Sequence, residues 1–179
     1  MTRMVSGIDS VEQHLEQLRA DPEVYRPERC PHCGKAGLHQ HGQYVRNAPR
    51  GEGMAFSLES LVIPRFYCPR CQGTCSRLPA CLAPRRQYRW ATQQAVLEGL
   101  MGGESRRTVA RRPGSGRRTL GRWWQWLQGR FALHGFHLRS RFAELGRAED
   151  WKGFWSFCFQ RLGLGPAMVE LERAGVVVL

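Results

Sequence analysis

The sequence predicts an α+β protein, with a small β-sheet module near the N-terminus followed by an all-α region. One observation is a pair of Cys-x-x-Cys motifs that flank segments with strand-like alternation and turn residues. The other is a run of short helical patterns rich in arginine, which begins near residue 90. On these grounds we divide the chain into four parts. They are residues 1–23, 24–84, 85–131 and 132–179.

Residues 1–23 predict a short amphipathic helix, because Val11, Leu15 and Leu18 fall on one face. This segment lacks the apolar core of a signal peptide, and no apolar run approaches the roughly 20 residues of a transmembrane helix. We therefore expect a cytoplasmic protein with no membrane partner. In that reducing compartment, seven cysteines indicate metal ligands or free thiols rather than disulfides.

Residues 24–84 contain the motifs Cys30-Pro-His-Cys33 and Cys68-Pro-Arg-Cys71. Structural zinc takes four thiolate or imidazole ligands in a tetrahedron, and each motif brings two sulfur atoms to one ion. We therefore predict one structural Zn²⁺ held by these four residues, here called the four-cysteine cluster. The alternative is a set of reduced structural cysteines without metal.

The residues between the motifs predict antiparallel strands. Apolar residues stand at alternating positions at Phe56, Leu58 and Val62, after Tyr44 and Val45, and "NAPRGEG" is typical of a turn. Gly34 and Gly73 fit the tight backbone after each motif. Together these features predict a zinc ribbon. Because so small a sheet buries little apolar surface, the metal would contribute folding free energy directly.

Other residues of this region could compete as ligands, and we expect them to be surface or core residues instead. They are His32, His39, His41, Cys75 and Cys81. Cys158 has no partner in the pattern and is typical of a small buried apolar side chain.

Residues 78–90 predict a linker, and two short helices follow it. The first covers "ATQQAVLEGLMGG", with apolar residues at helical spacing and a Gly-Gly stop. The second covers "ESRRTVARR", with Ser105 as its N-cap and Val109 and Ala110 facing inward.

A third helix is predicted over "SGRRTLGRWWQWLQGRF", with Ser115 or a neighbour as its N-cap. Its inner stripe consists of Leu120, Trp123, Leu127 and Phe131. Three short helices with tight turns predict a helix-turn-helix domain, in which the third helix reads DNA. One of the three tryptophans at 123, 124 and 126 must face outward, because positions so close cannot share one face.

The formal net charge of +12 is concentrated in one part of the chain. Residues 85–147 carry 14 basic and 3 acidic groups, a net charge of +11. A focused basic region indicates a polyanionic partner, nucleic acid above all, although a solvated basic face is the alternative. The predicted DNA-binding residues are Ser115, Arg117, Arg118, Thr119, Arg122, Arg106, Arg107, Arg85, Arg86 and Arg89.

Residues 132–179 predict further helices with polar turns. The segment "GPAMVELERAG" has Pro166 at a helix start and Gly175 at its end. The aromatic segment "WKGFWSFCFQRL" either packs on the helix-turn-helix or forms a partner surface.

The two motifs, the run "IPRFYCPRC" and the helix "RRTLGRWW" resemble the N-terminal DNA-binding regions of bacterial insertion-sequence transposases. In particular, the chain resembles short stand-alone transposase-like proteins over roughly residues 28–131. The resemblance implies zinc at the four-cysteine cluster and DNA contact through the third helix. Transposases of this kind also carry a ribonuclease-H-like domain with three separated carboxylates, whereas Asp9, Asp21 and Asp150 are the only aspartates here.

We therefore expect no enzyme and no catalytic residues. The expected function is that of a zinc-dependent protein of mobile-element origin that binds double-stranded DNA in the bacterial cytoplasm, associated with the nucleoid. Its partners would include a transposase or another nucleoprotein component. The alternatives are a protein-interaction adaptor within such a complex, a transcriptional repressor, and RNA binding through the ribbon.

Overall fold

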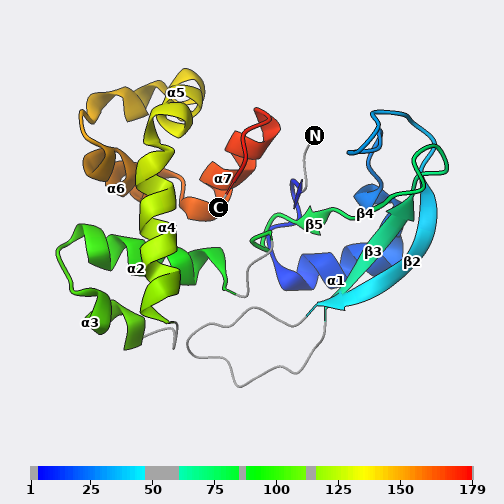
Figure 1. The fold of residues 1–179 in the computed structure, drawn as a ribbon, viewed down its shortest axis with the longest axis horizontal. Helices are drawn as coiled ribbons and strands as arrows, with labels where there is room; N and C mark the ends of the chain where they lie inside the picture. Colours follow the sequence, from blue (N-terminus) through cyan, green and yellow to red (C-terminus); the bar gives the residue numbers. More distant parts are fainter. Residues whose placement is uncertain (1–3, 47–60, 85–87, 112–115, 179) are drawn as a thin grey trace. The chain divides into compact units, whose positions relative to one another are not determined.

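A computed structural model describes residues 4–46, 61–84, 88–111 and 116–178. The chain folds into two compact units, and the boundary between them falls between Gln87 and Tyr88. The first unit contains all the strands, and the second is helical (Figure 1). The α+β class predicted from the sequence is confirmed.

The first unit combines two small sheets with a helix. Its elements are β1 (Met4–Val5), α1 (Val11–Ala20), the 3₁₀ helix η1 (Pro22–Tyr25), β2 (His39–Arg46), β3 (Leu61–Tyr67), β4 (Thr74–Cys75) and β5 (Leu78–Pro79). Strands β2, β3 and β4 form an antiparallel sheet in that order, whereas β1 and β5 pair in parallel.

The segment predicted as a linker at 78–90 is ordered core over its first half, so that prediction is wrong. Leu78 pairs with Met4 in the parallel sheet, and Leu82 packs in a buried cluster with Leu61 and Ile63. Because the partner strand lies more than 70 residues upstream, no local pattern reveals this pairing.

Helix α1 begins with a capping box. The Ser10 hydroxyl accepts a hydrogen bond from the Gln13 N–H, and the Gln13 side chain accepts one from the Ser10 N–H. The predicted apolar stripe is only half-buried, whereas His14 is fully buried beside it. His14 Nδ1 lies 2.6 Å from the Tyr25 hydroxyl, and Nε2 lies 3.0 Å from the Val62 carbonyl oxygen.

The β2–β3 hairpin contains a bulge at Gly42, which has a φ of +71°. The residues Gln40 and Gln43 pair with Phe66 and Pro64, so β2 carries one extra residue. The alternation predicted through Val62 does not mark the buried side of β3, because its neighbours Leu61 and Ile63 are buried and Val62 is half-buried. Phe56 and Leu58 lie outside the described residues.

The second unit is a cluster of helices built around α4. Its elements are α2 (Trp90–Met101), α3 (Arg106–Arg111), α4 (Arg117–Gly129), α5 (Phe131–Arg141), the 3₁₀ helix η2 (Ala143–Arg147), α6 (Trp151–Arg161) and α7 (Leu164–Arg173). Helix α2 contacts α3, α4, α6 and α7, while α3 and α5 contact α4 near its two ends (Figure 1).

Tight packing joins α2, α3 and α4 into the predicted three-helix arrangement. Ser105 caps α3, since its hydroxyl accepts a hydrogen bond from the Thr108 N–H. Val109 packs against Gly99 of α2, where an added Cβ would lie only 2.6 Å from Val109 Cγ1. Three of the four predicted residues of the inner stripe of α4 are buried, namely Leu120, Trp123 and Leu127. The fourth, Phe131, is half-buried and begins α5 instead.

The remaining aromatic residues attach the C-terminal helices to α4. Trp124 packs edge-on against Trp151 of α6, and Trp126 packs against His134 of α5. Neither Trp124 nor Trp126 is exposed, so the expectation of one outward-facing tryptophan is wrong. Helices α5 and α6 cover Trp126 and Trp124, which would lie on the surface of an isolated three-helix domain.

Candidate functional site

The two Cys-x-x-Cys motifs form matching knuckles at the same end of the β2–β3 hairpin. In the first knuckle, the Cys30 N–H donates to the Lys35 carbonyl oxygen at 2.8 Å. In the second, the Cys68 N–H donates to the Gly73 carbonyl oxygen at 2.9 Å. In both knuckles the hydrogen bond joins two residues that are five positions apart, and both cysteines of the motif lie within the turn that it closes.

The residue directly after each Cys-x-x-Cys motif has a left-handed backbone conformation, but only one of the two residues is a glycine. Gly34 has a φ of +71°, as expected for a tight turn. At the matching position of the second knuckle stands Gln72, with a φ of +57°. An added Cβ at Gly73 would lie 3.2 Å from the His32 ring and 3.4 Å from Cys71 Sγ, so a larger residue there would have to displace the His32 ring slightly.

The four predicted cysteines come together, with their sulfur atoms all within 4.8 Å of one another. Cys30 Sγ lies 3.6 Å from Cys71 Sγ, and Cys33 Sγ lies 3.7 Å from Cys68 Sγ. A tetrahedral ion with metal–sulfur bonds of about 2.3 Å requires sulfur–sulfur distances of about 3.8 Å. The four-cysteine cluster can therefore hold a metal ion.

Backbone hydrogen bonds lower the thiol pKa of two of the four cysteines, Cys30 and Cys68. Desolvation raises the pKa of the Cys30 thiol, but the N–H groups of Cys33 and His32 and the neighbouring thiols outweigh it and lower the pKa to about 7. The N–H groups of Cys71 and Arg70 lower the pKa of the Cys68 thiol. Because thiolates are the metal-binding form, these donors favour the ligand state of both cysteines.

None of the competing residues joins the cluster within the described parts of the chain. The histidines His39 and His41 are exposed on β2, where their rings flank Tyr67. Cys75 is half-buried in the apolar cluster beneath the knuckles, and Cys158 is fully buried in the second unit, as predicted.

The second candidate site is a set of exposed arginines on α3 and α4, here called the arginine face. Its members are Arg106, Arg107, Arg117, Arg118 and Arg122. Among the described residues, none of these side chains pairs with a carboxylate. The Arg106 guanidinium lies beside Gly121 of α4, 3.7 Å from the position of an added Cβ, so an arginine of α3 reaches the neighbouring helix.

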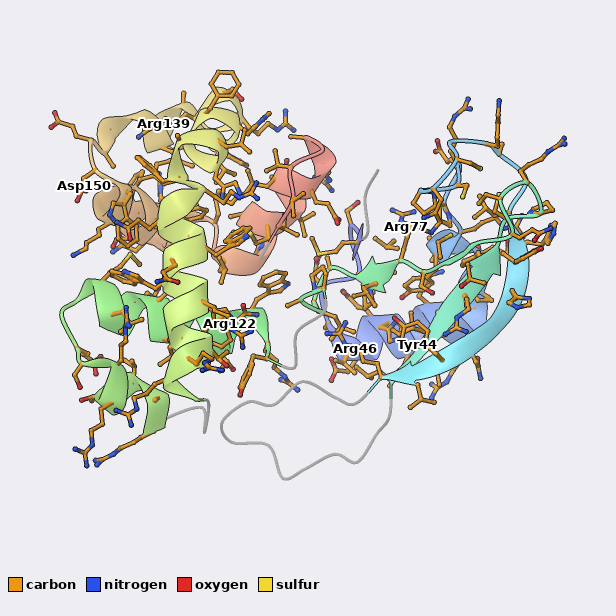
Figure 2. The ribbon with its side chains drawn as sticks, viewed as in Figure 1. Tyr44, Arg46, Arg77, Arg122, Arg139 and Asp150 are labelled. Carbon is orange, nitrogen blue, oxygen red and sulfur yellow. The ribbon has the colours of Figure 1, made fainter. Side chains whose placement is uncertain are left out.

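The other predicted DNA-binding residues have different positions. Thr119 is half-buried on α4, and Arg122 projects from α4 (Figure 2). Arg89 precedes α2, is half-buried and has contacts of its own. Ser115, Arg85 and Arg86 lie outside the described residues.

Sequence reasoning missed the buried His14, whose ring ties α1 to η1 and to β3. Burial lowers the pKa of His14, although the Val62 carbonyl opposes this shift. Because both ring nitrogens already lie within hydrogen-bonding distance of protein groups, His14 is a structural residue rather than a metal ligand. The only local signal is its place next to the apolar stripe of α1.

The fold and site define a protein with a four-cysteine cluster that could hold a metal ion and an arginine-rich three-helix module. The chain belongs to the family described as "Domain of unknown function (DUF6431)", which matches residues 30–123. The match begins at the first ligand cysteine and ends at Trp123, the buried tryptophan of α4. No curated protein and no solved structure matches the chain. No helix in the described ranges is long and apolar enough to cross a membrane.

Proposed function

We propose that the protein binds duplex DNA through α3 and α4 and depends on zinc for the fold of its first unit. The observation that carries the proposal is the arginine face. Five exposed guanidinium groups on two adjoining helices, unpaired with carboxylates among the described residues, form a surface suited to a polyanion.

Helix α4 supports this function by the division of its two faces. Leu120, Trp123 and Leu127 anchor one side in the core, whereas Arg118 and Arg122 lie one turn apart on the exposed side. In a helix-turn-helix, the N-terminal turns of the second helix enter the major groove. Arginine can there bind guanine or phosphate through two hydrogen bonds.

Zinc is the metal we propose for the four-cysteine cluster. Four thiolates in a tetrahedron are typical of structural zinc, which needs no open coordination position. When bound, zinc would crosslink the two knuckles and so fix the ends of the hairpin. The cysteines themselves supply the ligands, and the N–H groups around Cys30 and Cys68 stabilise their negative charge.

The extent of the family supports a joint role for the two sites. Residues 30–123 include the whole four-cysteine cluster, α2, α3 and the first turns of α4, but none of α5 to α7. The proposal assigns no catalytic step to the chain. The mobile-element origin, and association with a transposase in the bacterial nucleoid, rest on the resemblance of the motifs.

Selection of duplex DNA from a random pool, followed by titration of the selected site, tests the proposal. Arg118→Ala should lose about 1–3 kcal/mol on the selected site and much less on random DNA, because base edges differ between sequences while phosphates do not. Arg147→Ala, an exposed arginine at the end of η2, is the matched control and should change neither affinity. A chain that enriches no duplex sequence, or an Arg118→Ala variant with unchanged preference, would contradict the proposal.

A protein-interaction adaptor is the second candidate, and one observation favours it. Leu133 and Phe136 on α5 are 42% and 68% exposed, an unusual exposure for large apolar side chains. A partner of the adaptor would bind this face. In that case Phe136→Asp should abolish assembly with the partner while duplex binding persists. If DNA binding were lost as well, α5 would belong to the DNA-binding fold instead.

A further inference from the structure

Two exposed histidines on the first unit flank a tyrosine on the neighbouring strand. The ring centroids of His39 and Tyr67 lie 6.0 Å apart, and those of His41 and Tyr67 lie 5.3 Å apart. The interplanar angles are 42° and 37°, so the three rings are tilted rather than perpendicular. We call these three residues the ring patch.

The strand register explains why these rings share one face. His39 pairs directly with Tyr67. His41 stands at the bulge of β2, and its ring lies even closer to Tyr67 than that of His39, so both histidines share the side of Tyr67. Phe66, which precedes Tyr67, points to the opposite side and is fully buried. The ring patch therefore lies on the outer surface, and none of its members belongs to the four-cysteine cluster.

The strands and turns around the ring patch carry most of the positive charge of the first unit. The described residues 26–46 and 61–84 carry seven basic side chains and a single acidic one, Glu28, whereas the other five described acidic side chains of the unit lie within residues 9–23. Lys35 and Arg70 are exposed in the two knuckle turns next to the ends of these strands. The partner that combines negative charge with flat ring faces is a nucleic acid strand.

We propose that the ring patch is a stacking platform for the unpaired bases of single-stranded DNA. Bases inside a duplex are already stacked on each other, so only unpaired bases can offer a ring face to His39, His41 and Tyr67. Lys35 and Arg70 hold the backbone phosphates beside the platform. The choice of DNA over RNA rests on the proposed function, whereas the stacking itself is independent of the arginine face.

Binding of the full, zinc-loaded chain to two oligonucleotides of equal length tests this proposal. One is oligo(dT), and the other is an abasic strand with the same number of phosphates. The chain should bind oligo(dT) about fivefold to a hundredfold more tightly, which is the range for one stacked base. The double variant His39→Ala/His41→Ala keeps only Tyr67 of the platform, so its preference for oligo(dT) should fall sharply, and its zinc content should match that of the unaltered protein.

Two further variants separate stacking from other effects. The variant His39→Phe/His41→Phe keeps the rings but removes the imidazole nitrogens, and it should retain the preference for oligo(dT). Gln40→Ala changes an exposed residue between the histidines that points to the other side of β2, and it should alter nothing.

The outcomes that overturn the proposal are specific. Equal binding of oligo(dT) and the abasic strand by the unaltered chain would exclude stacking, and so would loss of preference in the phenylalanine variant. Tighter, histidine-dependent binding of an oligo(U) RNA would overturn the choice of DNA. Duplex binding should be unchanged in the alanine double variant, so failure here is distinguishable from failure of the arginine face.

Discussion

Removal of one ligand from the four-cysteine cluster should unfold the first unit and leave the second intact. The serine variant of Cys33 is the sharpest perturbation, because it deletes one corner of the sulfur tetrahedron. Cys30 and Cys68 are two of the seven buried residues in the apolar cluster beneath the knuckles. Loss of the metal therefore removes both the crosslink and the reason for burying two ionisable thiols.

The expected magnitude follows from the four-sulfur geometry. Structural zinc bound by thiolates in small domains contributes about 10–16 kcal/mol of apparent binding free energy at neutral pH. A whole domain is commonly stable by only about 5–15 kcal/mol. Since these two quantities are comparable, the first unit should not fold without the metal.

Metal analysis and X-ray absorption on the purified chain measure this directly. We expect one zinc per chain with four sulfur neighbours at about 2.3 Å. Cys33→Ser should lose that zinc and one of two unfolding transitions in urea. Cys75→Ser, which removes a thiol outside the cluster, should keep both. A Cys33→Ser protein that still binds one zinc through four sulfur atoms would refute the ligand assignment.

Three further predictions concern the second unit. Burial lowers the pKa of His134 from 6.5 to about 4 in the folded protein. As the pH falls, this histidine is therefore protonated in the unfolded chain before it is protonated in the folded one. Between pH 6.5 and 4 the free energy of unfolding should therefore fall by about 3 kcal/mol, and His134→Leu should lack this dependence in urea titrations. Gly99→Ala should lower the melting temperature, because the added methyl group would be overpacked against Val109. Overpacking costs about 1–3 kcal/mol, whereas alanine gains at most about 1 kcal/mol in helix propensity. An unchanged melting temperature would argue against close packing of α2 on α3. Asp150→Ala should cost about 1 kcal/mol by calorimetry, because Oδ1 of this N-cap residue (Figure 2) accepts the Gly153 N–H at 2.8 Å.

Local spacing predicted the features that depend on neighbours in the sequence. The paired motifs identified all four residues of the four-cysteine cluster, because a Cys-x-x-Cys turn needs only its own backbone. The inner stripe of α4 followed from helical periodicity, and the N-cap at Ser105 from side-chain chemistry.

The features that were missed depend on residues far apart in the chain. His14 is buried by Tyr25 and by the carbonyl of Val62, the latter 48 residues away. The pairing register of β2 and β3 shifts at the bulge at Gly42, and β5 pairs with the distant strand β1. The burial of Trp124 depends on α6, which no pattern within α4 can indicate.

The affinity for duplex DNA as a function of salt tests the central claim most directly. Each phosphate neutralised by a basic side chain adds about 0.9 to the slope of log affinity against log salt. Replacement of Arg117, Arg118 and Arg122 by alanine should therefore reduce the slope by up to about 2.7, whereas replacement of Arg147 and Arg161 should leave it unchanged. Duplex binding that weakens equally with salt in the protein and in the α4 triple variant would contradict DNA recognition by the arginine face.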